Sequence, residues 1–181
     1  MKGSTDDKDI LSLLERDQVK GFRMLVEKYS RRLYWHIRRL VVIHEDADDA
    51  LQNTFINCWN KIGDFRQESS LGTWLYRIAT NEALMMIRKR RRLAESSLES
   101  INDILSLADE GNGWFDGDEA ETQLQNAILS LPEKQRLVFL MRYYDELSYE
   151  DISRITGTTA GALKASYFHA VRKIEKFISG N

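Results

Sequence analysis

The chain has 181 residues, of which 43% are hydrophobic and 30% charged, and its net charge is −2. Such a composition fits one or two small globular domains. Its single cysteine, Cys58, excludes an internal disulfide and a cysteine-rich zinc site, and its three histidines lack the spacing of metal ligands. No stretch is apolar enough for an export signal or for a membrane span, which needs about 18 apolar residues. We therefore expect a protein of a reducing compartment, with no metal, no cofactor and no membrane insertion.

The residue types predict an all-helical fold. Only one proline and ten glycines interrupt a chain rich in Leu, Ile, Arg, Lys and Glu, and no alternating apolar run indicates a sheet. Residues 1–95 carry a net charge of +4, residues 96–122 carry −8 without any Lys or Arg, and residues 123–181 carry +2. We therefore expect two small helical domains, residues 1–95 and 123–181, joined by a flexible acidic linker. A disordered spacer without a further role is the simpler alternative.

In the first domain, the helical spacing of apolar residues predicts helices over about 9–14 and 21–42. A third helix is expected to begin in the acidic segment 45–49, since carboxylates favour a helix N-terminus. Its apolar stripe faces the core, and its opposite side presents Asp49, Gln52, Asn53, Ile56 and Asn60. An exposed isoleucine among amides is typical of a protein-docking surface, although an ordinary solvated face is the alternative.

A long helix is predicted over about 70–92. One of its faces carries Trp74, Arg77, Asn81 and Arg88, and it ends in a basic run over residues 88–92. This combination suits nucleic acid, because an aromatic ring stacks on an unpaired base, an amide reads base edges and cations hold phosphate. The alternative is that Trp74 belongs to the core and that the arginine run is a solvated helix end.

The second domain carries a helix-turn-helix pattern. A helix starts near Pro132, and Ser148 with Asp151 forms a capping box for a short helix that Gly157 ends. The next helix starts at Thr158 or Thr159. Its more exposed positions are Lys164, Phe168, His169, Arg172 and Lys173. For a DNA-binding domain, Lys164 and Ser166 would approach base edges or phosphates, and Arg172 and Lys173 would hold the backbone. A plain helical hairpin is the alternative.

No grouping of residues indicates catalysis. His169 fits a surface polar residue or a phosphate donor, and His36 fits a neighbour of Trp35 on one helix face. The sequence has no glycine-rich phosphate loop, no H-E-x-x-H motif and no Ser/His/Asp grouping. We therefore expect that the protein is not an enzyme and has no catalytic residues.

Together these motifs resemble an extracytoplasmic-function (ECF) type sigma factor of bacterial RNA polymerase, of the sigma-70 family, over nearly the whole chain. Residues 46–55, followed by Trp59, are similar to the family segment D-A-E-D-L-V-Q-E-T-F…W, which binds the β′ clamp helices of the polymerase. The resemblance implies that a docking strip on the third helix binds core polymerase through Asp49, Gln52, Asn53 and Ile56. Asn53 stands where the family usually has an acid.

Residues 73–81 are similar to the family stretch T-W-L-Y-R-I-A-R-N. In the family, this helix and the preceding loop melt the minus-10 promoter element and hold a flipped base. The resemblance implies that Trp74 and Asn81 contact bases, that Arg77 and Arg88 hold the strand, and that the loop around residues 65–72, with Phe65, forms the base pocket. Stacking and edge contacts offset the few kcal/mol that extruding a base costs.

The segment from Leu131 onwards resembles the family domain that reads the minus-35 element. The resemblance implies the DNA contacts Thr159, Lys164, Ser166, His169, Arg172 and Lys173. Two arginine positions of the family pattern are lost, because K-S-R is Lys164-Ala165-Ser166 here and H-R-A-R is Phe168-His169-Ala170-Val171.

The resemblance implies a cytoplasmic sigma factor that directs promoter-specific transcription initiation. Its partners would be core RNA polymerase, through the β′ clamp helices and the β flap, and promoter DNA. An anti-sigma factor is a further expected partner, although no residue identifies one. The acidic linker would thread towards the RNA exit path. We also predict a compact free protein whose two modules separate on polymerase. The alternatives are a stand-alone helix-turn-helix regulator and a helical interaction scaffold.

Overall fold

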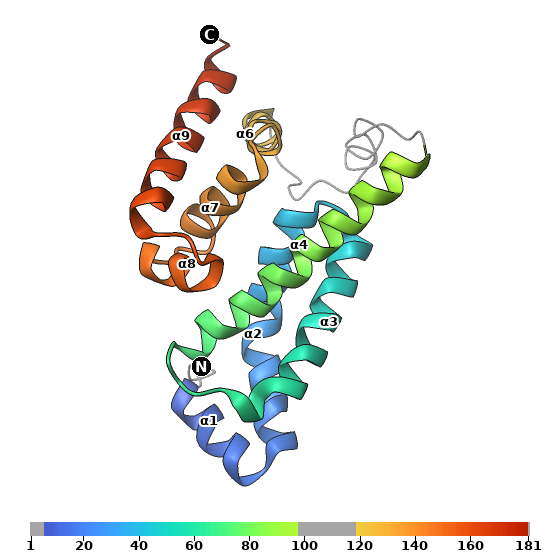
Figure 1. Ribbon diagram of the computed structural model, residues 1–181, viewed down its shortest axis with the longest axis vertical. Coiled ribbons are helices and arrows are strands. Elements are labelled where there is room, and N and C mark those ends of the chain that lie inside the picture. The colour runs from blue at the N-terminus through green and yellow to red at the C-terminus, as the bar shows by residue number, and fades with distance from the viewer. Residues whose placement is uncertain (1–5, 98–118, 181) are drawn as a thin grey trace.

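The computed structural model describes residues 6–97 and 119–180, and within these ranges the chain forms helices and no strand. The helices of the first module are α1 (Asp7–Arg16), α2 (Gln18–Val41), α3 (His44–Lys61), a 3₁₀ turn (Ile62–Asp64) and α4 (Leu71–Ser97). Those of the second module are α6 (Glu119–Leu129), α7 (Glu133–Tyr143), α8 (Tyr149–Thr156) and α9 (Ala160–Ser179). The predicted all-helical fold is confirmed (Figure 1).

The first module is a bundle of four helices that follow one another in sequence and in space. Side-chain oxygens of Asp6 and Asp17 cap the starts of α1 and α2, which explains the sharp break between these two helices. Gly21 permits the corner, because a Cβ there would lie 2.5 Å from the backbone nitrogen of Leu14. The fully buried Leu25, Leu33 and Ile37 of α2 join Leu75 and Ala79 of α4 in the core.

The second module holds the predicted helix-turn-helix. Ser148 caps α8 by accepting a hydrogen bond from the Asp151 backbone N–H at 3.0 Å, as the capping box predicts. Gly157 ends α8 in the left-handed conformation, with φ 71°, and Thr159 caps α9. The buried Ile152 of α8 packs in the same core as Leu163 and Ala170 of α9, so the two helices are fixed as one unit.

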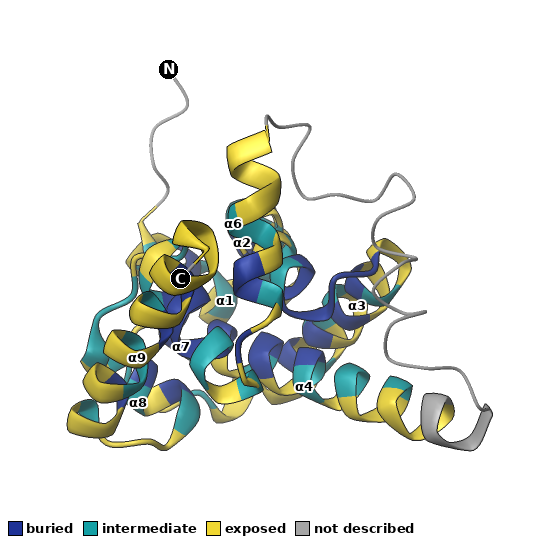
Figure 2. Ribbon diagram, turned by 90° about the horizontal axis from the view of Figure 1, so that it is seen from above, coloured by how far each residue is buried: buried dark blue, intermediate teal, exposed yellow. Residues whose placement is uncertain are grey.

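The two modules pack against each other, with α4 in contact with α8 and α2 in contact with α7. Buried apolar residues of both modules form one continuous cluster. In Figure 2 the buried residues of α2, α4 and α7 gather at the centre of the molecule, while exposed residues cover most of α9. In the described part of the chain, the two modules are therefore in direct contact.

The helices extend into the predicted linker from both sides. α4 continues to Ser97 and α6 begins at Glu119, so both overlap the segment 96–122 that the charge pattern marks. Helix α4 thereby ends five residues beyond Arg92, near which the predicted helix was expected to end. The remaining linker residues, 98–118, lie outside the described residues, and their predicted path on polymerase stays a prediction.

Candidate functional site

The docking strip lies on the open side of α3. Ala47, Ala50, Thr54 and Cys58 form the buried side of the helix. The four strip residues Asp49, Gln52, Asn53 and Ile56 are all exposed, and Ile56 is 52% exposed. The apolar surface continues one turn further on, where Trp59 is 39% exposed and meets Phe22 edge to face at 5.0 Å. The strip is thus a polar surface with apolar side chains set in it and beside it, and no described residue covers it.

The predicted minus-10 face lies along α4. Arg77, Asn81 and Arg88 are exposed, as their helical spacing predicts. Trp74 differs, because it is half-buried against the core and its ring centroid lies 5.2 Å from that of Phe65. Trp74 therefore combines the two alternatives left open by the sequence, since one part of the ring packs in the core while another part stays accessible.

The basic run at the end of α4 is partly engaged in ion pairs. Arg90 binds Asp46 of α3 at 2.6 and 3.0 Å, and Arg91 binds Glu133 of α7 at 3.3 Å. Arg88, Lys89 and Arg92 instead line an open groove of about 580 Å³ together with Asn53, Glu82, Met85 and Leu93. Cationic groups that face solvent are available to hold phosphate.

Helix α9 presents the residues predicted to read the minus-35 element. Lys164, His169, Arg172 and Lys173 are exposed, and the Arg172 guanidinium lies 5.2 Å from the Phe168 ring centroid. Thr159 is exposed as well, but its hydroxyl accepts a hydrogen bond from the Ala162 N–H at 3.4 Å and so also caps the helix. Ser166 is half-buried and faces the first module.

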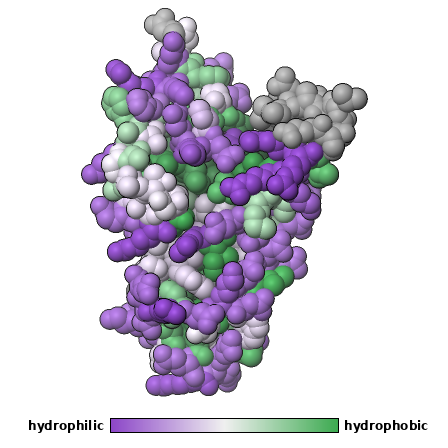
Figure 3. Space-filling model, viewed as in Figure 1, coloured by the Kyte–Doolittle hydropathy of each residue, from purple (hydrophilic) through white to green (hydrophobic). Residues whose placement is uncertain are grey.

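Three of the predicted DNA-binding residues, Asn81, Arg88 and Ser166, line one cleft between the modules. The cleft has a volume of about 340 Å³ and lies between α4 and the helix-turn-helix. Its lining also includes Leu84 from the first module, and Leu137 and Thr158 from the second. Figure 3 shows mainly hydrophilic side chains on one face of the molecule, interrupted by small apolar patches. Ser166 therefore lies opposite α4 in this arrangement.

His36 has a role in the fold that its position beside Trp35 on α2 does not indicate. Its ring is buried, with a side-chain exposure of 0%. Its Nδ1 donates to Asp145 Oδ2 of the second module at 2.6 Å, and its Nε2 lies 2.9 Å from Thr80 Oγ1. Burial, reinforced by the charge of Asp145, raises the pKa of the adjacent Tyr76 phenol. The sequence carries no signal for this site, since its two halves are 109 residues apart.

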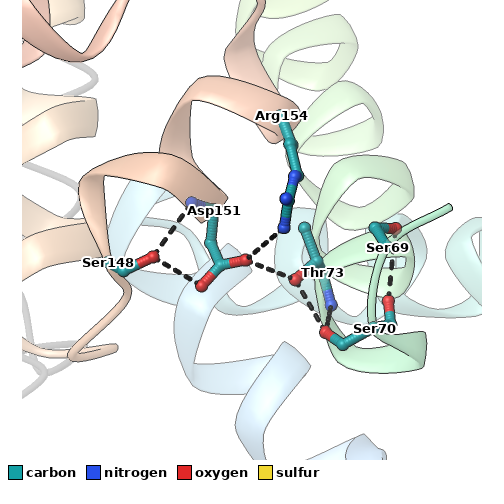
Figure 4. Close-up of polar contacts among 6 residues, drawn as sticks. All are labelled: Ser69, Ser70, Thr73, Ser148, Asp151 and Arg154. Carbon is teal, nitrogen blue, oxygen red and sulfur yellow. Dashed lines mark hydrogen bonds and ion pairs between the residues drawn. The ribbon is translucent and has the colours of Figure 1, made fainter.

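A second polar contact joins the starts of α4 and α8 (Figure 4). Thr73 Oγ1 donates to Asp151 Oδ1 at 3.0 Å, and Ser148 Oγ donates to Asp151 Oδ2 at 2.7 Å. Ser70 in turn caps α4 by accepting from the Thr73 N–H at 3.0 Å. The capping carboxylate of the helix-turn-helix is therefore bound to the first module as well as to its own helix.

The described residues contain neither a candidate metal site nor a candidate membrane-spanning helix. In residues 6–97 and 119–180, no group of three or more His, Cys, Asp or Glu side chains is arranged to hold a metal ion. Within the same ranges, no helix is both long and apolar enough to cross a membrane.

Comparison with known proteins matches each module to a family. Residues 25–93 match sigma-70 region 2, and residues 121–174 match sigma-70 region 4. The chain is 29% identical over 178 residues to the RNA polymerase sigma-H factor of Pseudomonas aeruginosa, which covers 94% of this chain and 92% of the relative. It is also 29% identical over 180 residues to the ECF RNA polymerase sigma-E factor of Haemophilus influenzae, with 95% of each chain covered.

A solved structure has the same fold. The sigma factor RpoE in complex with the anti-sigma factor NepR from Bartonella quintana aligns with a TM-score of 0.70 and 24% identity, covering 88% of this chain and 98% of that one. A region 2 module followed by a region 4 helix-turn-helix defines a transcription initiation factor of the sigma-70 class. The chain belongs to the ECF group of the sigma-70 family.

As a sigma factor, the protein directs promoter-specific transcription initiation by bacterial RNA polymerase, and it is not an enzyme. A stand-alone helix-turn-helix regulator is not favoured, because residues 25–93 match sigma-70 region 2.

Proposed function

We propose that the two modules divide the work of initiation between them. The first module, residues 1–95, binds core polymerase and opens the minus-10 element, and the second, residues 123–181, reads the minus-35 element. The division is supported by the elements that carry the surfaces: the docking strip is exposed on α3, whereas the DNA-facing residues lie on α4 and α9.

Core binding is assigned to Asp49, Gln52, Asn53 and Ile56, with the β′ clamp helices as the partner. The observation that carries this assignment is the exposure of an isoleucine beside a carboxylate and two amides on one helix face. Such a surface combines an apolar contact with hydrogen-bond groups, as interface cores with polar rims do. The second module contacts the β flap.

Opening of the minus-10 element is assigned to Phe65, Trp74, Arg77, Asn81 and Arg88. Phe65 and Trp74 lie together at the entrance to α4, where the accessible part of their paired rings offers a stacking platform for an unpaired base. Asn81 offers amide groups to a base edge, and Arg77 and Arg88 are exposed to meet phosphates.

Reading of the minus-35 element is assigned to Thr159, Lys164, Ser166, His169, Arg172 and Lys173. The exposed cations of α9 suit the DNA backbone, and the N-terminal part of α9 is the part that enters a major groove about 12 Å wide. Since Ser166 faces α4 in the closed arrangement, the modules must separate before α9 can insert. Two elements lying about two helical turns apart also require that separation.

The place of action that this function requires is the cytoplasm, where the chromosome lies. An anti-sigma factor is proposed as a regulator, by analogy with the structural neighbour that was solved with one. Its binding surface on this chain is not assigned.

Transcription in vitro tests the proposal. Purified bacterial core polymerase is incubated with fragmented genomic DNA of the source organism, with and without the full chain, and transcript starts are sequenced. We expect starts that appear only with the protein and share two upstream elements. Operator binding by the protein alone, without any dependent start, would instead support the stand-alone regulator.

A further inference from the structure

One face of α2 gathers cations and an exposed tryptophan. At about 100° per residue, five side chains fall within about 100° of one another on this face: Lys28, Arg31, Arg32, Trp35 and Arg39. They extend over about 16 Å of the helix, at about 1.5 Å per residue. The one acidic residue of α2, Glu27, falls outside this range. None of the five belongs to the docking strip or to the residues assigned to DNA on α4 and α9.

Three of these five side chains are available to a ligand. Arg31, Arg32 and Trp35 are exposed, and within the described part of the chain neither Arg31 nor Arg32 forms an ion pair. The other two cations are engaged, because Lys28 binds Asp7 at 2.6 Å and the remaining arginine binds a carboxylate of the second module at 3.5 Å. The candidate site is therefore made of two arginines and one tryptophan.

The ring of Trp35 is held in position by its neighbours. Its centroid lies 5.4 Å from that of Tyr34 in an edge-to-face arrangement, and the Arg39 guanidinium lies 6.0 Å from it. The residue nevertheless stays 36% exposed. An unpaired base of any sequence can stack on such a ring, because every base has a π face. A ring that is already held in place loses little conformational freedom when it binds.

The site lies next to the loop that is assigned to the flipped base. The two arginines and Trp35 line an open groove of about 640 Å³, together with Ser70 and Gly72 at the start of α4. A Cβ added at Gly72 would lie 3.4 Å from the Tyr29 hydroxyl, so the first turn of α4 packs directly on α2. Trp35 follows about 9 Å further along α2. A strand that leaves the loop at residues 65–72 therefore meets this face of α2 next.

Carboxylates also line the groove, but three of the four have partners. Asp7 accepts hydrogen bonds from a lysine and a tyrosine of α2, both at 2.6 Å. Asp145 and Asp151 accept hydrogen bonds from the first module. The fourth, Glu146, is exposed on the turn after α7, so its charge leaves the groove when the modules separate on a promoter. The two arginines of α2 then give the groove a surplus of positive charge, which suits phosphate.

We propose that Arg31, Arg32 and Trp35 form a further binding site for single-stranded DNA, in which Trp35 stacks on an unpaired base and the arginines hold neighbouring phosphates. The strand bound there is the promoter strand next to the base in the pocket at residues 65–72. This last step rests on the proposed function, whereas the binding chemistry does not. A duplex would leave Trp35 unused, because its bases are already stacked on one another.

Binding of an oligonucleotide by the full chain tests the arginines. Fluorescence anisotropy follows a labelled single strand of about 12 nucleotides over a range of salt concentrations. Arg31→Gln with Arg32→Gln should weaken binding about 10-fold and lower the logarithmic salt slope by about 1.4 units, since each phosphate contact on a single strand contributes about 0.7.

The matched control combines Arg16→Gln and Arg23→Gln, which remove the same charge at exposed positions of α1 and of another face of α2. It should keep the slope of the wild type. Equal slopes for the wild type and the Arg31/Arg32 variant, equal losses in both variants, or no binding by the wild type at low salt would each overturn the site.

The tryptophan leaves a different signature. Trp35→Leu removes the aromatic face but keeps an apolar side chain, so affinity for the single strand should fall about 10-fold with an unchanged salt slope. Trp35→Phe should retain most of the affinity. A duplex of the same sequence should be insensitive to either change. Circular dichroism establishes that each variant keeps its helices, and an equal loss for duplex and single strand would overturn the stacking role.

Transcription in vitro separates this site from the proposed function, because oligonucleotide binding needs neither core polymerase nor a promoter. If the oligonucleotide results are as expected but no transcript start depends on the protein, the proposed function fails and the DNA site stands. If the wild type directs transcription while the variants bind the oligonucleotide as the wild type does, the DNA site fails and the proposed function stands.

Discussion

The docking strip on α3 and the DNA-facing residues around α4 and α9 differ in what covers them. The strip is open to solvent along its whole length, whereas Asn81 and Arg88 share a cleft with Thr158 and Ser166. Both surfaces are exposed, but the second module stands opposite Asn81 and Arg88, whereas no described residue stands opposite the strip. Solvent exposure of single residues therefore does not by itself tell how much room a surface leaves for a partner.

Cys58 lies on the buried side of α3, opposite the docking strip. The reactivity of its thiol therefore tests whether that side of the helix is closed to solvent. Burial raises the pKa of the Cys58 thiol from 9.0 to about 12, and thiolate is the reactive form. At pH 8 we expect the folded protein to react with a soluble disulfide reagent at least about 1,000-fold more slowly than the urea-unfolded chain. Stopped-flow absorbance measures both rates, and similar rates would show that the inner side of α3 is accessible.

Because folding raises the pKa of the Cys58 thiol, the free energy of unfolding should depend on pH. The folded state binds the thiol proton more tightly than the unfolded state does. The stabilisation that this tighter proton binding gives the folded state is therefore complete below pH 9.0 and is lost as the pH rises towards about 12. Chemical unfolding at a series of alkaline pH values should show the decline, and a Cys58→Ala variant should show a smaller one.

Reversing charge on the open strip should have the next largest effect. Asp49→Lys with Gln52→Ala places a cation and a truncated side chain in the proposed interface, so we expect core affinity to fall by about 100-fold. Fluorescence anisotropy with labelled protein measures this loss. Glu27→Lys with Gln18→Ala makes the same changes at exposed positions of α2 and should leave affinity unchanged. Equal losses in both variants would remove the strip from the interface.

Truncating a residue of the cleft should affect DNA opening and leave core binding intact. Asn81→Ala removes the proposed base contact, and we expect the melted promoter population to fall by about 10-fold. Permanganate reactivity of minus-10 thymines measures melting in the assembled complex. Asn126→Ala, at an exposed position of α6, is the control. A parallel loss of core affinity would place Asn81 at the polymerase surface instead.

The smallest effect is expected at the helix-turn-helix. Lys164→Ala removes one exposed cation of α9, so promoter affinity should fall about 3-fold and the logarithmic salt slope by about one unit. A salt titration of promoter binding by the assembled holoenzyme measures the slope. Lys61→Ala, on α3, is the matched control, and an unchanged slope for Lys164→Ala would exclude a phosphate contact.

Much of the fold could be predicted because its signals are local. The capping box at Ser148, the glycine end at Gly157 and the start of α9 at Thr159 depend on neighbours a few residues away, and all three are confirmed. The exposure of the strip also follows from helical period alone. The end of α4 was less predictable, since no proline or glycine marks it and the helix runs to Ser97.

The contacts between the modules could not be predicted from the sequence. His36 and Asp145 are 109 residues apart, and Thr73 and Asp151 are 78 apart, so neither pair leaves a periodic pattern. Asp151 was correctly predicted as a capping residue, but its second oxygen serves the other module. Helical spacing likewise places Trp74 on the open face of α4, although its ring is large enough to pack against the core.

The positions of Asp145 and Asp151 near the end of the chain have a consequence during synthesis. The helices of the first module are complete by Ser97, but Asp145 and Asp151 follow about 50 residues later. At about 5–20 residues per second, the newborn first module spends several seconds without the contacts of these two residues. Its docking strip is already complete during that interval, so a ribosome-bound chain arrested before Asp145 should bind core polymerase, as a pull-down of arrested chains would measure.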